Sequence, residues 1–255
     1  MSDRPTTTPL QRERGFALIF VMVMLLLCGL VVLGSARLGW LQERMLGAES
    51  DHQRAFAAAE ALIRDAELDI RGQQANADQP CRPEPAFVGC RNFGAGHPFF
   101  PQDENDLDLL QARLASTATG CLRGICLPST VRALGLDNWT TQLPAMTAGT
   151  GDTSVAARYG EFTGIHPASA GNALLHWSRP GDASAVAPRA WYWVEVFWYD
   201  SGIPAGAASL HELTPDQKHP FVYRITAYVQ GLKPGTRVWL RSVYVPRPQA
   251  GRGLQ

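Results

Sequence analysis

The longest apolar run in the chain covers residues 15–36, GFALIFVMVMLLLCGLVVLGSA, and contains no charged residue. It directly follows the polar segment 11–14, QRER. A helix needs about 20 apolar residues to cross the roughly 30 Å hydrocarbon core of a bilayer, so this run is long enough to span a membrane. No proline occurs between Pro9 and Pro80, and the pattern therefore predicts a helix that continues from the membrane into soluble sequence.

The sequence after the apolar run has the periodicity of an amphipathic helix. One face, with spacings of three and four, consists of Leu38, Leu41, Met45, Ala48, His52, Ala55, Phe56, Ala59, Leu62, Ile63 and Ala66. Most charged residues fall on other faces, namely Glu43, Arg44, Glu49, Asp51, Arg64, Asp65 and Glu67. We predict one helix with a membrane-spanning half at 16–36 and an amphipathic half at 37–71, about 80 Å long at 1.5 Å per residue.

Three segments near the C-terminus alternate as β-strands do, at residues 191–199, 221–230 and 237–245. The segment 231–235, GLKPG, has the composition of a hairpin turn. The economical fold is an antiparallel sheet that covers residues 191–246 and packs on the long helix, burying Leu41, Met45, Phe56 and Ile63. The fold class is therefore α+β: a long N-terminal helix, membrane-spanning in its first half, packed on a C-terminal antiparallel β-sheet head, with a tail at 247–255.

Residues 72–190, between the helix and the sheet, are predicted to be largely irregular and to contain disulfide bonds. A helix is expected at residues 103–115, capped by Asp103 or Asn105, because Leu107, Leu110 and Leu114 share one face. Residues 145–188 are crowded with Gly, Ala, Ser and Thr, a composition that favours surface loops over a core.

The N-terminus has three interpretations. A cleaved secretory signal would use the small residues at 34–36, GSA, but its apolar core is normally about 7–15 residues. A permanent, uncleaved anchor is the second. The third is cleavage between Gly15 and Phe16 on the cytoplasmic side, which removes residues 1–15 as a leader and keeps the apolar helix. The leader is mildly basic, so the N-terminus is expected to stay in the cytoplasm and the head to be exported.

Cysteine usage agrees with export. Cys28 lies in the apolar run, and four cysteines follow in the exported part, which allows three pairings. The spacing favours Cys121–Cys126 and Cys81–Cys90. A zinc site is the rival interpretation, but neither spacing is that of a CxxC pair.

Three N-terminal motifs resemble those of PilX-type minor pilins of type IV pili. They are RGFALI at 14–19, LQERMLG at 41–47 and RAFAAAE at 54–60. YRITA at 223–227 and the strand at 238–245 look like the end of the same family, whereas the middle of the chain shows no such match.

The resemblance implies that Gly15 is the last leader residue and that Phe16 becomes the N-methylated mature terminus. Major pilins carry a glutamate at the fifth mature position, understood to pair with a neighbouring subunit's terminal amine; here that position is Phe20. A buried carboxylate in a membrane persists only with a partner, so its loss suits a tip or an initiation complex, unless Phe20 is an apolar substitution without positional meaning. We expect subunit packing through Phe20, Leu41, Met45 and Phe56.

The resemblance predicts a minor pilin that primes pilus assembly and lies at or near the tip. Its expected partners are other minor pilins, the major pilin, a tip-associated adhesin, the prepilin peptidase and the inner membrane. The chain is expected to cross this membrane once, with its head in the periplasm. It is then expected to join an adhesive pilus (fimbrium) on the cell surface. Two alternatives remain: a K-type pseudopilin of type II secretion, and a single-pass periplasmic binding or signalling module.

Catalytic and metal-binding motifs are absent or weak in the sequence. There is no GxSxG, no HExxH and no glycine-rich phosphate loop. The acidic segment 103–108 lacks the glycine that a calcium loop needs. Formal charge is balanced, with no basic stripe for nucleic acid. We therefore expect no enzyme, no cofactor, no metal site and no nucleic-acid partner.

Overall fold

The computed structural model describes residues 16–75, 81, 90–91, 97–128, 130–133, 139–179, 181–183, 185–199, 215 and 219–246. Contacts divide the chain into two units, residues 1–49 and residues 50–255. We call residues 16–49 the stem and residues 50–255 the head.

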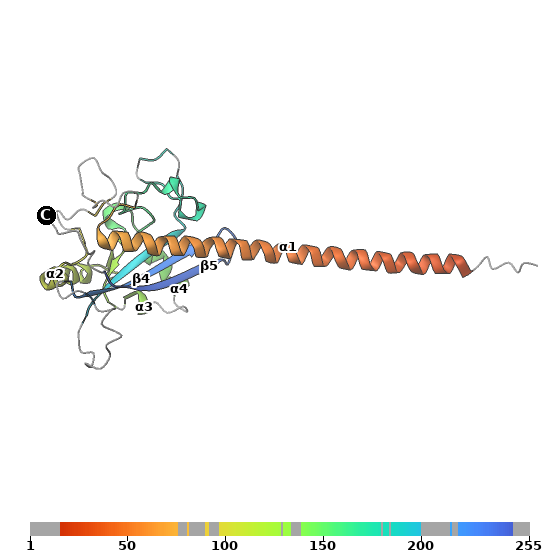
Figure 1. Ribbon diagram of the computed structural model, residues 1–255, viewed down its shortest axis with the longest axis horizontal. Coiled ribbons are helices and arrows are strands. Elements are labelled where there is room, and N and C mark those ends of the chain that lie inside the picture. Colours follow the sequence, from red (N-terminus) through yellow and green to blue (C-terminus); the bar gives the residue numbers. More distant parts are fainter. Residues whose placement is uncertain are drawn as a thin grey trace, which may run out of the picture. The chain divides into compact units, whose positions relative to one another are not determined.

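The predicted long helix is present as α1, Phe16–Arg71 (Figure 1). It ends where Gly72 adopts a φ of +62°, a left-handed conformation that glycine takes without a Cβ clash. The Gly72 N–H then donates to the Asp69 carbonyl, and the Gln73 N–H donates to the Leu68 carbonyl, both at 2.9 Å. These bonds satisfy carbonyl groups that the last helical turn leaves without partners.

The head contains one five-stranded sheet in the order β1-β2-β3-β4-β5. The three long strands are β3 (Ala190–Trp198), β4 (Phe221–Gln230) and β5 (Arg237–Tyr244), paired antiparallel as predicted. The sequence analysis missed two strands of two residues each, β1 (Cys121–Leu122) and β2 (Ile125–Cys126). Strand β2 runs parallel to β3, so the sheet is mixed at this side rather than wholly antiparallel.

The main core lies between α1 and one face of the sheet. Small side chains on the buried helix face let the two elements approach closely. From α1 this core takes Ala55, Ala58, Ala59, Leu62, Ile63, Ala66 and Ile70; from the sheet it takes Ile125, Ala190, Tyr192, Val194, Val196, Phe221, Tyr223, Ile225, Ala227, Val229 and Val238.

The opposite face of the sheet carries a second, aromatic core. The short helices α3 (Thr130–Ala133) and α4 (Trp139–Met146) contribute to it. Its large side chains are Trp139, Trp191, Trp193, Tyr228 and Trp239. Trp139 and Trp239 have ring centroids 3.6 Å apart, and Tyr228 lies 4.1 Å from Trp239. Trp191, Tyr192 and Trp193 of β3 are therefore core residues, whereas Trp198 at the end of the strand is 45% exposed.

Helix α2, Glu104–Ala115, confirms the predicted helix and its cap. The Asp103 side chain accepts a hydrogen bond from the Asp106 N–H at 2.9 Å. Leu107, Leu110 and Leu114 are buried. Three 3₁₀ helices follow α4: η1 (Gly151–Thr153), η2 (Pro167–Ser169) and η3 (Ala173–Leu175).

Two predictions about burial are wrong. Met45 is 72% exposed and Phe56 is 43% exposed, whereas Ile63 is buried. The buried face of α1 is centred near Ala55, and Phe56 follows about 100° further around the helix, which places it at the edge of the core. The side chain of Leu41 lies outside the described residues.

The region 145–188 also contributes to the core, contrary to its composition. Ala157 and Leu174 have no exposed area, and Phe162 is 2% exposed. Ala157 forms an isolated bridge with Tyr192 on β3, through two backbone bonds of 3.1 and 2.9 Å. Contacts with residues distant in sequence bury these side chains, and such contacts leave no local periodicity.

Candidate assembly site on the stem and head

The apolar part of the stem exposes its side chains all around the helix. Every residue from 17 to 37 is exposed, including Leu18 at 68% and Leu33 at 66%. Within the described part of the chain, α1 is the one helix long and apolar enough to cross a membrane. A helix that is apolar on all sides needs lipid or other helices around it, so this segment is suited to a bilayer or a bundle of similar helices.

The predicted processing positions lie at the boundary of the described residues. Gly15 lies outside them, and Phe16 is the first residue of α1, with an undescribed side chain. Phe20 is 60% exposed. Cleavage at Gly15–Phe16, methylation of Phe16 and packing through Phe20 therefore stay predictions, as does the role of exposed Met45 and Phe56 in subunit contacts.

Asp51 attaches the β4–β5 turn to the helix at the end of the head where the chain enters from the stem, which we call the stem end. Its carboxylate accepts the N–H groups of Leu232 at 3.0 Å and Lys233 at 2.9 Å. Burial opposes ionisation, but these bonds outweigh it and lower the pKa of Asp51. An added Cβ at Gly231 would lie 2.6 Å from the Thr236 Cβ, so only glycine fits beside this contact.

Asp65, about four helical turns after Asp51, attaches the loop 159–165 to α1. Its carboxylate accepts the Gly160 N–H at 2.8 Å and the Thr163 hydroxyl. The side chain is 2% exposed. Burial raises the pKa of Asp65 to about 7, against the effect of these two bonds, and the nearby Asp69 and Glu161 charges add to the rise. Asp65 therefore changes charge near neutral pH.

Asp69 joins three parts of the head in the last turns of α1. Arg91 donates Nε and Nη2 to its two oxygens, each at 2.7 Å. Tyr192 of β3 donates its hydroxyl to the same carboxylate at 2.9 Å. The Arg91 guanidinium also lies 3.9 Å from the Phe162 ring centroid. Removal of one member of a buried ion pair leaves an uncompensated charge, so this cluster is a strong constraint on the far part of the head.

A sequence signal for these aspartates existed and was missed. The sequence analysis counted Asp51 and Asp65 among the charged residues that fall mostly on other faces of the helix. Both lie seven residues from Ala58, one before it and one after, and Asp69 lies seven residues after Leu62. Residues seven apart share a helix face, so Leu62 of the predicted apolar face places Asp69 on the buried side, and Ala58, which the structure buries, places Asp51 and Asp65 there.

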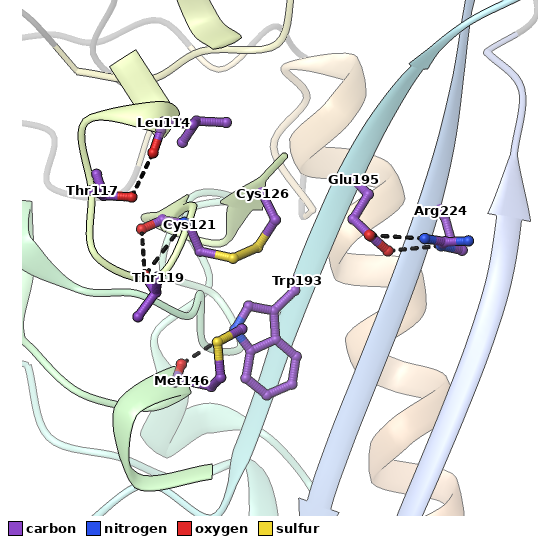
Figure 2. The surroundings of a disulfide bond; sticks show 9 residues. All are labelled: Leu114, Thr117, Thr119, Cys121, Cys126, Met146, Trp193, Glu195 and Arg224. Atoms are coloured by element: carbon purple, nitrogen blue, oxygen red, sulfur yellow. Dashed lines mark hydrogen bonds and ion pairs between the residues drawn. A yellow bond between two sulfur atoms is a disulfide. The ribbon is translucent and has the colours of Figure 1, made fainter. Parts of the chain in front are cut away.

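Both disulfide bonds have the pairing that the spacing favoured. Cys121 and Cys126 close the β1–β2 hairpin with a Cα–Cα distance of 4.1 Å, and Cys81 and Cys90 are 5.5 Å apart. In Figure 2 the Cys121–Cys126 bond lies near the Trp193 ring, whose Nε1 donates to the Met146 carbonyl at 3.3 Å.

The hairpin also makes a close backbone contact with β3. The Val194 N–H donates to the Gly124 carbonyl at 2.7 Å. Gly124 has a φ of +78°, and a Cβ there would lie 2.9 Å from the Ala157 nitrogen. The disulfide and this glycine together hold β2 beside β3.

Glu195 and Arg224 form an ion pair on the face of the sheet that also carries Trp193 (Figure 2). The distance from Arg224 Nε to Glu195 Oε2 is 2.7 Å, and that from Arg224 Nη2 to Glu195 Oε1 is 2.8 Å. No group of three or more potential metal-ligating side chains is present within the described ranges. The polar side chains of the head described above bond to one another and to backbone groups, an arrangement that fixes the head on α1.

Comparison with known families agrees with this architecture. A family model described as the C-terminal part of type IV pilus assembly protein PilX matches residues 110–246, more than half of the chain. A model of the PilX N-terminal region matches residues 14–64. No curated protein and no solved structure matches the chain. The family is one of structural pilus components, and with the apolar helix it indicates a membrane-anchored pilus protein. The chain thus belongs to the PilX family of type IV pilus assembly proteins.

Proposed function

We propose that the chain is a minor pilin that primes assembly of the type IV pilus and stays at or near its tip. The observation that carries the proposal is the uncharged, exposed surface of residues 17–36. Such a surface suits lipid before assembly and neighbouring stems afterwards, because both surroundings are apolar. The same helix thereby serves first as an anchor and then as part of the filament core.

Phe20 supports a position at an end of the filament. A carboxylate at the fifth mature position is useful only where a neighbouring terminal amine can pair with it. The apolar side chain of Phe20 does not need a terminal amine as its partner. A subunit with phenylalanine at this position can therefore occupy a place in the filament where no subunit precedes it. Other minor pilins, the major pilin and a tip-associated adhesin are its proposed partners, and the prepilin peptidase is proposed to cut at Gly15–Phe16.

The proposed orientation places the N-terminus in the cytoplasm and the head in the periplasm. The two disulfide bonds support export, because such bonds persist in oxidising compartments. The proposed final location is the pilus on the cell surface.

Deletion of the gene, with complementation, tests the priming role. Pilus number should fall sharply while the remaining pili keep normal length, because initiation fails and elongation does not. Gold labelling of an epitope tag on the head should mark pilus ends or membrane complexes. Labelling along the shaft at major-pilin density would overturn the tip position, and a type II secretion defect with normal piliation would favour the K-type pseudopilin.

Phe20→Glu tests the role of the missing carboxylate, with Phe20→Leu as the matched apolar control. The acidic variant should still insert, because one acid near a helix end costs at most about 3 kcal/mol, and it should enter the shaft more often. Equal shaft labelling for both variants would contradict the positional meaning of Phe20.

A further inference from the structure

The stem end of the head has a basic surface, formed by Arg54 on α1, Lys233 in the β4–β5 turn and Arg237 at the start of β5. All three side chains are exposed. Leu232 is 52% exposed beside them. The nearby Asp51 carboxylate is buried and accepts two backbone N–H groups of the turn. We call Arg54, Leu232, Lys233 and Arg237 the basic surface.

Strand β5 ends the sheet, and its outer edge adjoins this surface. Gly231 donates its N–H to the Thr236 carbonyl at 2.9 Å, which sets the alternation of paired residues along β4 and β5. By that alternation, the backbone groups of Arg237, Trp239 and Arg241 point away from β4. Among the described residues no strand pairs with this edge, so the basic surface continues into unpaired backbone.

Helix α2 exposes acidic side chains at the opposite end of the head. Gln102, next to the N-cap of α2, lines one cavity together with Ile70 and Arg71, so α2 starts at the end of α1 (Figure 1). Its first turns expose Asp103, Glu104 and Asp108. Leu109 is 67% exposed on the same helix. We call Asp103, Glu104, Asp108 and Leu109 the acidic surface.

We infer that the basic surface of one copy of the chain docks on the acidic surface of a second copy, head to tail. Each surface combines exposed charges of one sign with one exposed leucine, and the two signs are complementary. The 21 residues from Asp51 to Arg71 separate the ends by about 30 Å at 1.5 Å per residue. A shift of one copy along the helix axis by about that length therefore brings the two surfaces together.

The contact is heterologous, so it leaves one free surface at each end of a stack. The inference goes beyond the proposed function and does not depend on the tip position. A short stack of copies would still present a free acidic surface to whatever lies above it.

Anionic lipid is the main rival for the basic surface. Vesicle binding that depends on Lys233 and Arg237 distinguishes this rival from a contact between copies. A second rival is edge protection, since charged side chains on an edge strand deter aggregation; it does not explain the opposite charge on α2.

Photo-crosslinking of the full chain in detergent tests the contact. The photo-reactive residue p-benzoylphenylalanine replaces Leu232, and this protein is mixed with a heavy-nitrogen-labelled copy. Mass spectrometry should find crosslinks from residue 232 to residues 103–109 of the other isotopic form. The same replacement at Val186, which is 45% exposed, is the control and should give no such crosslink.

Charge reversal tests the mechanism. Lys233→Glu with Arg237→Glu should lower the crosslinked yield about tenfold, and so should Glu104→Lys with Asp108→Lys. Mixing the two double variants should restore it, whereas Arg64→Glu, an exposed charge elsewhere on α1, should have no effect. A rise from about 0.1 M to 1 M salt shortens the Debye length from about 10 to 3 Å and should weaken the wild-type contact.

Three results would overturn the inference: crosslinks only within one isotopic form, crosslinks to another part of the second copy, or no restoration on mixing. Binding to phosphatidylglycerol vesicles that requires Lys233 and Arg237, without mixed-isotope crosslinks, would assign the surface to lipid instead. Tryptophan emission of each variant checks that the head is folded, because the substituted side chains are exposed and Trp139, Trp191 and Trp193 of the aromatic core are buried.

Discussion

Replacement of Asp65 by asparagine should remove a large part of the pH dependence of the head's stability. The substitution keeps the shape of the side chain and one oxygen, which can still accept the Gly160 N–H or the Thr163 hydroxyl. It removes the charge that the wild type acquires near pH 7 in a buried site. The comparison therefore isolates the energetic effect of a single ionisation.

The magnitude follows from the two pKa values. Asp65 ionises near pH 3.8 in the unfolded chain and near pH 7 in the folded chain. Between these values the folded chain holds a proton that the unfolded chain releases, so the free energy of unfolding falls as pH rises. The loss is about 1.4 kcal/mol per pKa unit, or on the order of 4 kcal/mol over about three units. Stability from this group is fully present below pH 4 and lost above pH 7.

Urea unfolding of the full chain in detergent, followed by tryptophan fluorescence, measures the effect. Trp193 is fully buried and reports on the head. Glu161, whose pKa is also raised by burial, is present in both proteins, so the difference reports the titration of Asp65 together with its coupling to Glu161. Relative to the wild type, Asp65→Asn should gain stability steadily from about pH 4 to pH 7 and then stay constant. A difference that does not change with pH would refute the reasoning.

Three further predictions concern other parts of the chain. Asp51→Ala should lower the free energy of unfolding by about 1–3 kcal/mol at pH 7, because two N–H groups of the β4–β5 turn lose their acceptor; unchanged urea unfolding would contradict the role of this contact. The Cys121→Ser, Cys126→Ser double variant should lose about 2 kcal/mol without reductant, and equal stability of the oxidised wild type and this variant would count against it. Gly15→Arg should leave a precursor longer by the leader and absent from pili, whereas Gly15→Ala should be processed; normal-sized mature protein from Gly15→Arg on an immunoblot would exclude this cleavage site.

Local patterns were sufficient to predict the elements that carry long repeats. The strands β3, β4 and β5 each alternate over at least eight residues, and the structure places their ends within one residue of the prediction. Helix α2 was predictable because Asp103 caps it and three leucines share its buried face. In each case the residues of the element itself carry the pattern that specifies a strand or a helix. Tertiary contacts stabilise the element but are not needed to specify it.

Strands β1 and β2 could not be predicted from the sequence in the same way. Each has two residues, too few for any alternation to show. Their position depends on the Cys121–Cys126 bond and on a contact between Gly124 and Val194, which are far apart in sequence. The spacing of Cys121 and Cys126 favoured a disulfide bond between them. It did not indicate that the residues beside this bond would pair with β3 as part of the sheet.

The face of α1 was predicted only in part. Hydrophobicity assigned Met45 and Phe56 to the core and excluded the charged Asp51 and Asp65, and the structure reverses all four. The side chains of Asp51 and Asp65 can be buried here because backbone N–H groups and a hydroxyl donate to their oxygens. Those donors come from turns distant in sequence, so a helical wheel alone could not supply them.

Mass spectrometry of the chain's own N-terminus tests the central claim most directly. The sample is the chain recovered from sheared pili and, separately, from membranes of the same cells. The account predicts that the pilus-derived chain begins with N-methylated Phe16 and lacks residues 1–15. A chain that retains Met1 and occurs only in the membrane fraction would contradict the account and would identify an uncleaved anchor instead.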